Sequence, residues 1–267
     1  MAKAMRLIEE NIKICDGALY VLDARAPISC INQNFDKIIG VKKTLYLLNK
    51  SDLVSEESSG YFLNYFKKEG KQCLAVQGNS QSCSKTIQSK LKQIFKDKIQ
   101  KDKTNGVFLP LKIMVIGIPN TGKSAVINSI CGERKAKTAD KPGVTKTKQW
   151  VKLDDILLLD TPGTMPPYFG NQDLAANLAL IGSINDDILD LNGLCLLLIG
   201  KLPLKIIEDK YKIQTQNLTS AQIFESICKK RGYILKGGEI DIERGSKAVI
   251  DDFRKGRLGK ICLEQVL

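Results

Sequence analysis

Residues 117–125, "GIPNTGKSA", decide the fold class of this chain. They fit the pattern GxxxxGK[ST], with the apolar run "LKIMVI" before them and a helical pattern over residues 123–130 after them. Gly117 and Gly122 allow backbone amides to turn toward phosphate groups, and the following helix presents its positive end. The stretch therefore predicts a phosphate-binding loop between a strand and a helix, rather than a plain turn.

The chemistry of this loop points to a nucleoside triphosphate. Lys123 is expected to reach the β- and γ-phosphates, and the Ser124 hydroxyl is expected to bind Mg²⁺. Ala125 stands where a second hydroxyl residue is common, so only its backbone is expected to contact the α-phosphate. The expected nucleotide contacts in the loop are Gly117, Pro119, Asn120, Thr121, Gly122, Lys123, Ser124 and Ala125.

Apolar runs elsewhere predict the rest of the domain. Five of them indicate buried parallel strands that end in polar or glycine-rich loops, over residues 17–25, 43–52, 71–78, 111–120 and 155–163. Helical patterns occupy residues 4–14, 58–69, 85–98 and 123–130. This alternation predicts an α/β fold with a doubly wound, mostly parallel sheet, in which ligands bind at the carboxyl ends of the strands.

Two segments after the phosphate loop suit the sensing of a γ-phosphate. In "DTPG", residues 160–163, Asp160 closes an apolar strand and is expected to help hold Mg²⁺, and the Gly163 amide is expected to face the γ-phosphate. A simple turn is the alternative. In "KPGVTKTKQW", residues 141–150, Thr145 is the candidate switch threonine for Mg²⁺ and γ-phosphate, although spacing alone leaves this open.

"NKSD", residues 49–52, predicts recognition of guanine. Asp52 can accept hydrogen bonds from the ring N–H and the exocyclic amine of guanine, whereas adenine presents an acceptor there. Asn49 is expected to contact the opposite edge of the base, and the Lys50 stem to cover its face. Gly78, in "AVQGNS", is the candidate backbone amide for the guanine carbonyl. The alternative is a surface turn.

Composition restricts the setting. The chain has 267 residues, a net charge of +12, no histidine, and eight cysteines without a CxxC pair, so we expect reduced thiols and a cytoplasmic protein. It contains no run of eighteen apolar residues and no signal-peptide pattern, so no membrane partner is expected. The positive charge favours RNA as a partner, with solubility alone as the alternative. Residues 85–103 carry seven lysines and are interpreted as a solvated connector.

The motifs stand in an unusual order, which is NKSD, GIPNTGKS, PGVT and DTPG. Together with "DAR" at residues 23–25, "KQWVK" at 148–152 and "KKRG" at 229–232, this order resembles the circularly permuted GTPases of the YlqF/YawG type, in particular their ribosome biogenesis GTPase A group. The resemblance covers nearly the whole chain. Permutation keeps every loop at one edge of the same sheet, because only the connections change.

This resemblance implies a GTP-binding, GTP-hydrolysing assembly factor for the large ribosomal subunit whose nucleotide state controls docking on rRNA. The implied domains are a GTPase domain, residues 1–167, and a mainly helical RNA-binding domain, residues 168–267. From Lys201 onward, fourteen Lys and Arg residues stand against nine Asp and Glu residues, with basic clusters in "KKRGYILKGG" and "FRKGRLGK". We expect no DNA partner and a monomer away from the ribosome.

Hydrolysis by this chain is expected to be slow. Thr164 follows DTPG and is not the glutamine that positions water in many GTPases. Family members also have a histidine just before the residue that matches Met1, and this chain has no histidine. Either the segment that would carry this histidine was omitted from the sequence, which we favour, or the protein hydrolyses GTP poorly and depends on the ribosomal particle. Asn120 matches a K⁺ ligand of cation-dependent GTPases, or is only a polar loop residue. A nucleotide-gated RNA-binding scaffold and a P-loop ATPase or kinase are the alternatives in function.

Overall fold

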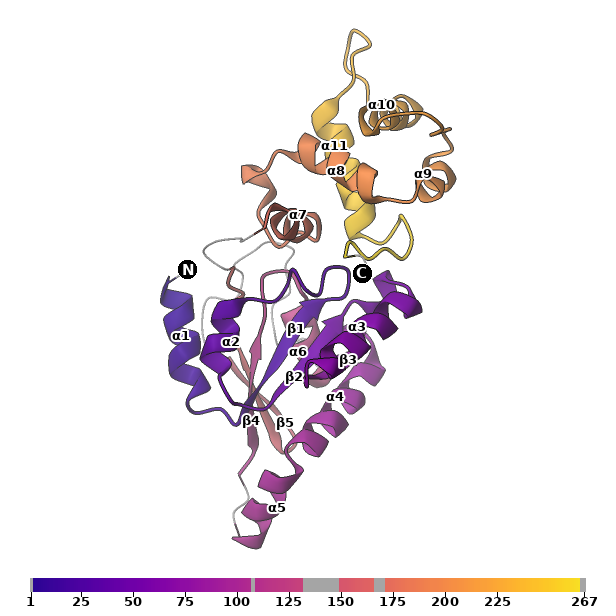
Figure 1. The fold of residues 1–267 in the computed structure, drawn as a ribbon. Coiled ribbons are helices and arrows are strands. Elements are labelled where there is room, and N and C mark those ends of the chain that lie inside the picture. Colours follow the sequence, from indigo (N-terminus) through magenta and orange to yellow (C-terminus); the bar gives the residue numbers. More distant parts are fainter. Residues whose placement is uncertain (1, 107–108, 132–148, 166–170, 265–267) are drawn as a thin grey trace.

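A six-stranded sheet forms the centre of the computed structural model, which describes residues 2–106, 109–131, 149–165 and 171–264. Across the sheet the strand order is β3 (Gln72–Ala75), β2 (Thr44–Asn49), β1 (Gly17–Asp23), β4 (Leu111–Ile116), β6 (Ile156–Asp160) and β5 (Gln149–Leu153). Neighbouring strands pair in parallel except β5, which runs antiparallel to β6. The predicted doubly wound, mostly parallel sheet is confirmed (Figure 1).

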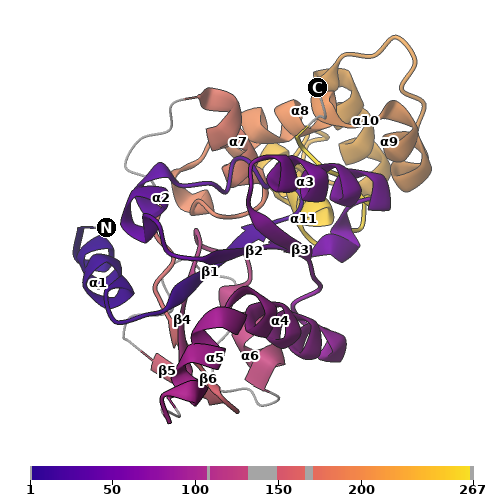
Figure 2. The same ribbon diagram turned by 60° about the horizontal axis from the view of Figure 1, so that its bottom comes forward.

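Helices cover both faces of the sheet (Figure 2). On one face lie α1 (Ala2–Ile12), α2 (Gln33–Ile39) and α3 (Glu56–Lys68), and on the other lie α4 (Gln81–Ile94) and α6 (Lys123–Cys131). Alternate residues of β1 serve the two layers, because Tyr20 and Leu22 pack in one apolar cluster while Leu19 and Val21 pack in the other. Burial on both faces explains why these strands read as continuous apolar runs.

Three local features differ from the sequence prediction. Strand β5 and helix α2 were not predicted, because β5 (QWVKL) lacks the continuous apolar run of the other strands and the α2 pattern spans only two turns. The helix predicted over residues 85–98 ends at Ile94, and α5 (Lys96–Thr104) follows. Phe95 separates them because its side chain is buried beside Gly17 at the start of β1.

The lysine-rich segment therefore has two parts. Helix α4 buries Ile87 and Leu91 against the sheet and is not merely a connector, whereas α5 buries no residue and projects from the end of the sheet farthest from the C-terminal helices (Figure 1).

The C-terminal region is helical, as predicted. It contains α7 (Gln172–Leu180), α8 (Leu191–Lys201), α9 (Leu204–Tyr211), α10 (Ser220–Arg231) and α11 (Ile242–Arg254). All five helices contribute buried side chains to its apolar cluster, among them Leu178, Leu198, Ile207, Ile227 and Val249. The expected domain boundary at residues 167 and 168 lies outside the described residues, so the two-domain division stays a prediction.

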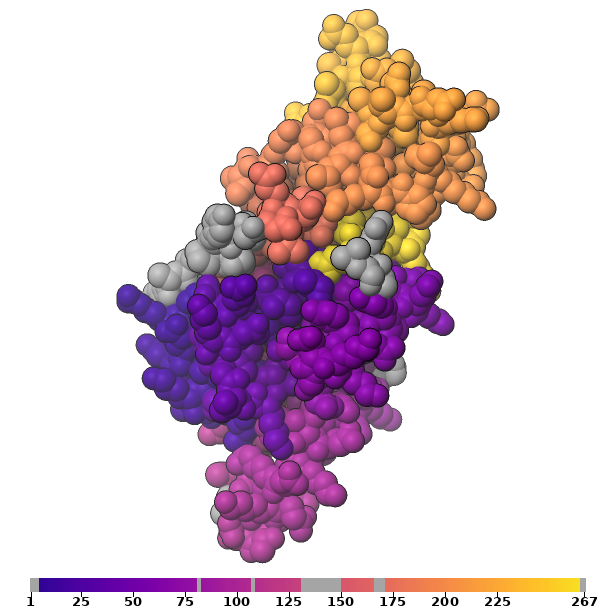
Figure 3. Space-filling view, in the orientation of Figure 1, coloured from indigo at the N-terminus to yellow at the C-terminus, as the bar shows by residue number. Residues whose placement is uncertain are grey.

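The helical region stacks on the carboxyl edge of the sheet (Figures 1 and 3). The chain after α11 returns to that edge, where the Ile261 amide donates to the Leu53 carbonyl at 2.9 Å and the Leu263 amide donates to the Arg25 carbonyl at 2.8 Å. Glu264 accepts hydrogen bonds from the Ser29 amide and hydroxyl. The last described residues of the chain therefore bind to loops at the carboxyl edge of the sheet. No helix among the described residues is long and apolar enough to cross a membrane.

Candidate functional site

Three of the sequence-predicted loops meet at the carboxyl edge of the sheet. The phosphate-loop residues follow β4, the NKSD residues follow β2, and the DTPG residues follow β6. Because β2, β1, β4 and β6 are parallel neighbours, their carboxyl ends lie side by side. The tertiary structure thus brings together loops that are about seventy and one hundred and ten residues apart in sequence.

Lys123 is buried at the start of α6, with an exposed fraction of 7%. Its Nζ donates to the Gly117 carbonyl at 3.0 Å and to the Ile118 carbonyl at 2.8 Å. Burial lowers the pKa of Lys123 to about 8, opposed by the negative charge of Asp160. An ammonium held in a desolvated position by two carbonyls and a nearby carboxylate is suited to bind an anion strongly.

Asp160 and Ser124 have the chemistry expected of a Mg²⁺ site. Asp160 is 2% exposed, its Oδ1 has no hydrogen-bond partner among the described residues, and burial raises its pKa against the opposing charge of Lys123. A buried, unpartnered carboxylate oxygen and a half-buried hydroxyl at a helix start are hard oxygen ligands, so these residues fit Mg²⁺. The ion would offset negative charge on phosphate oxygens. Thr145, the third candidate, lies outside the described residues.

Gly163 packs closely against the phosphate loop. A Cβ atom at this position would lie 2.8 Å from Lys123 Nζ and 2.9 Å from the Pro119 backbone, so a larger residue would push the lysine or the loop away. Thr164 is buried, and its hydroxyl contacts the Met5 sulfur at 3.2 Å rather than pointing toward Lys123. This contact gives no support to Thr164 as a group that positions water.

Asn49 connects the NKSD segment to the phosphate loop. Its Nδ2 donates to the Thr121 carbonyl at 2.8 Å, and its Oδ1 accepts from the Gly78 amide at 2.8 Å. Both polar ends of the side chain are therefore engaged within the protein. Gly78 is placed at the site as expected, but its N–H is bonded to Asn49, so its role toward a guanine carbonyl stays a prediction.

Asp52 and Lys50 have different surroundings in the turn after β2. Asp52 is exposed in a short 3₁₀ turn, Ser51–Leu53. A bound base would itself have to cover this carboxylate. Lys50 adopts a left-handed backbone conformation, with φ of 60°, and its Nζ donates to the Asn120 carbonyl at 2.7 Å.

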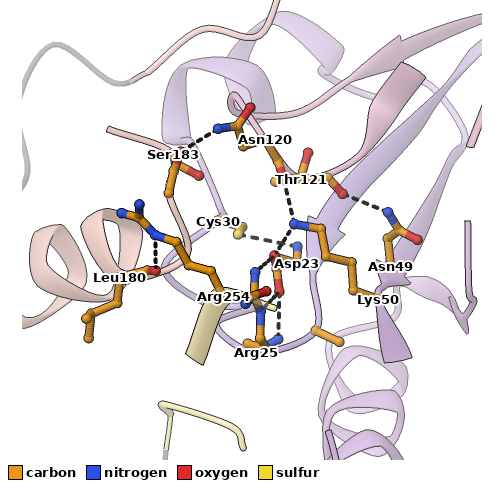
Figure 4. A network of polar contacts seen from close by, with 12 residues as sticks. Asp23, Arg25, Cys30, Asn49, Lys50, Asn120, Thr121, Leu180, Ser183 and Arg254 are labelled. Atoms are coloured by element: carbon orange, nitrogen blue, oxygen red, sulfur yellow. Dashed lines mark hydrogen bonds and ion pairs between the residues drawn. The ribbon is translucent and has the colours of Figure 1, made fainter. Parts of the chain in front are cut away.

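Sequence reasoning assigned no role to Asp23 and Arg25, yet both lie close to Lys50 of the NKSD segment (Figure 4). Asp23 is fully buried, and its Oδ2 pairs with Lys50 Nζ at 2.8 Å and with Arg25 Nη2 at 2.7 Å. Burial favours a higher pKa for Asp23, but the Lys50 and Arg25 charges outweigh it and lower the pKa well below its usual range. Their place at the end of strand β1, between β2 and β4, was the available signal.

The phosphate loop also contacts the helical region. Asn120 lies beside Ser183 (Figure 4), and its Nδ2 donates to the Gly182 carbonyl at 2.6 Å. The Ser183 hydroxyl donates to the Pro119 carbonyl at 2.7 Å. Nearby, Arg254 at the end of α11 donates to the Leu180 carbonyl at 3.0 Å. Residues just after α7 therefore touch the loop that is expected to bind the phosphates.

The fold and site define a P-loop GTPase with circularly permuted motifs. The family described as "50S ribosome-binding GTPase" matches residues 112–229. Ribosome biogenesis GTPase A of Bacillus cereus is 34% identical over 99% of this chain and 91% of its own length. The protein of that name from Thermotoga maritima is 29% identical over 98% of this chain and 91% of its own length.

A solved structure agrees with these relatives. GNP-bound YlqF from T. maritima superposes with a TM-score of 0.68 at 28% identity, over 98% of both chains. The chain belongs to the ribosome biogenesis GTPase A (YlqF) family, and it is a guanine-nucleotide-binding GTPase. The resemblance inferred from the order of the motifs is confirmed.

Proposed function

We propose that this GTPase is an assembly factor for the large ribosomal subunit and that its nucleotide state controls docking of the helical region on rRNA. The relatives are named for ribosome biogenesis, and the matching family is described as binding the 50S subunit. The helical region supplies compact basic clusters for phosphates, among them Lys229, Lys230 and Arg231 in the last turn of α10. These observations support rRNA as the partner.

The observation that carries the nucleotide control is the pair of contacts between the phosphate loop and the helical region. Gly182 and Ser183 bond to Asn120 and Pro119, two residues of the loop that would surround the β- and γ-phosphates. A change in that loop on nucleotide binding would alter both hydrogen bonds. The helical region would then have different preferred positions in the GDP and GTP states.

Within the site, we assign the base to Asn49, Lys50, Asp52 and Gly78, and the phosphates to residues 117–125 with Gly163. Mg²⁺ is assigned to Ser124, Asp160 and Thr145. The carboxylate of Asp52, exposed in the turn after β2, favours guanine over adenine because only guanine presents two donors to it. K⁺ near Asn120 is a further part of this proposal.

Cosedimentation with purified large subunits tests the proposal. The full chain is mixed with large or small subunits in GDP or in a non-hydrolysable GTP analogue with Mg²⁺. We expect pelleting with large subunits that is at least several-fold greater in the GTP analogue, and that falls as salt increases. Equal pelleting in both nucleotides would refute nucleotide control. Preferential pelleting with small subunits would refute the proposed partner.

The second part of the proposed function concerns the rate of GTP hydrolysis. Thr164 rather than glutamine stands directly after DTPG, and its hydroxyl contacts the Met5 sulfur. We therefore propose that the chain binds GTP but hydrolyses it slowly, with little stimulation by large subunits. Single-turnover hydrolysis with and without purified large subunits measures this. Strong stimulation would show that another residue, here or on the particle, positions the water.

A further inference from the structure

The buried charges at the end of β1 have no part in the expected chemistry of GTP. Asp23 and Arg25 are 0% and 2% exposed, and Asp23 lies beside the Lys50 side chain (Figure 4). Replacing a buried ion pair by apolar side chains of similar volume is often neutral or stabilising for a fold. Stability of the domain therefore does not by itself account for these charges.

The contacts of Asp23 are directed at one side chain of the guanine loop. One of its oxygens, Oδ1, accepts from the Arg25 amide at 3.0 Å and from Arg25 Nε at 2.9 Å. The other, Oδ2, is shared between Arg25 Nη2 at 2.7 Å and Lys50 Nζ at 2.8 Å. Lys50 Nζ also donates to the Asn120 carbonyl, so the ammonium is held between β1 and the phosphate loop.

Arg25 in turn is fixed from the helical region. Its Nη1 donates to the Arg254 carbonyl at 3.1 Å, and its guanidinium lies 5.1 Å from the centre of the Phe253 ring. Arg254 makes a two-point ion pair with Asp186, at 2.7 and 2.8 Å. A continuous set of contacts thus runs from the end of α11 through Arg25 and Asp23 to Lys50.

We propose that Asp23 is a positioning residue for guanine-nucleotide binding, which holds the Lys50 side chain against the phosphate loop, and that Arg25 anchors Asp23 to the end of α11. Lys50 bridges the base-recognition turn and the Asn120 carbonyl, so its position sets how these two loops meet around a nucleotide. A long lysine side chain has many rotamers, and fixing it in advance reduces the entropy cost of binding. This inference rests on the assignment of the NKSD loop to guanine proposed above.

A double-mutant cycle tests the role of Asp23. The variants Asp23→Asn, Lys50→Met and the double variant are compared in the full chain by the Kd and dissociation rate of a fluorescent GDP analogue. Loss of one charge-assisted hydrogen bond predicts about a tenfold rise in Kd for each single variant. If Asp23 acts through Lys50, the double variant shows about the same tenfold rise rather than a hundredfold one.

Two controls separate this role from general destabilisation. Lys255→Gln removes a surface ion pair with Asp251 near the end of α11 and is expected to leave GDP binding unchanged. Arg25→Lys keeps a positive charge beside Asp23 but loses the two-point contact, and serves if Asp23→Asn does not fold. It is expected to accelerate GDP dissociation several-fold, and to do so only while Lys50 is present.

Several outcomes decide the matter. Wild-type GDP binding by Asp23→Asn, or independent effects of Asp23→Asn and Lys50→Met that multiply, would overturn the positioning role. An effect of Arg25→Lys that persists in the Lys50→Met background would overturn the anchor. Asp52→Asn is measured in parallel: if it leaves GDP binding and base preference unchanged, the assignment of the NKSD loop fails. If it weakens binding while Asp23→Asn does not, only the present inference fails.

Discussion

Gly122→Ala should uncouple the guanine loop from the phosphate loop. Gly122 has a φ of 91°, and a Cβ atom there would lie 2.3 Å from Asn49 Nδ2. Asn49 is 2% exposed and bonded at both ends of its amide, so it can move away only by losing its bonds to the Thr121 carbonyl and the Gly78 amide.

The size of the effect follows from these contacts. A left-handed backbone costs an alanine about 1 kcal/mol, and loss of two buried hydrogen bonds costs about 1 kcal/mol each, so the free energy of unfolding should fall by about 3 kcal/mol. Gly232→Ala is the matched control, because Gly232 has a φ of 68° with no atom within 4 Å of the added Cβ. It should cost only about 1 kcal/mol.

Urea unfolding of both variants without nucleotide measures this difference in the free energy of unfolding, provided that the slope of that free energy against urea concentration is unchanged. Titration with a fluorescent GDP analogue should show about a thirtyfold weaker affinity for Gly122→Ala, equivalent to about 2 kcal/mol. Gly232→Ala should bind the analogue with unchanged affinity. Equal losses of stability in the two variants would refute the reasoning, since the contact with Asn49 would then contribute nothing.

Three further predictions concern base, phosphates and cation. Asp52→Asn should reduce the preference for GDP over ADP by at least tenfold, since an amide can present a donor or an acceptor; unchanged selectivity would contradict the assignment. Protonated Lys123 binds phosphate and burial lowers its pKa to about 8, so GTP affinity should be nearly full at pH 7 and fall as the pH rises through 8 to 9, whereas Lys123→Arg should show no such fall. GTP turnover should be faster in K⁺ than in Na⁺, and Asn120→Ala should remove the difference; equal rates in the wild type would exclude a K⁺ ligand.

The sequence determined the fold class and the order of the motifs, for a physical reason. Strands buried on both faces must be apolar along their length, and polar residues that follow them must lie at their carboxyl ends. The sequence pattern therefore predicts both the sheet and the edge of the sheet where ligands bind. Lys123, Asp160 and Asn49 could therefore be found before the structure was known. Strand β5 was missed because QWVKL is not a continuous apolar run, and helix α2 was missed because its seven residues are too few to show a helical period.

Only the tertiary structure decided which side chains join the loops through hydrogen bonds and ion pairs. That Asn49 bonds to Thr121, and that Asp23 joins Lys50 to Arg25, depends on contacts between strands and loops that no local pattern encodes. The break at Phe95 likewise follows from packing against β1, which overrides a helical pattern that continues in the sequence. Local propensity depends on neighbours in the chain, whereas buried charge pairs and close backbone approaches depend on neighbours in space.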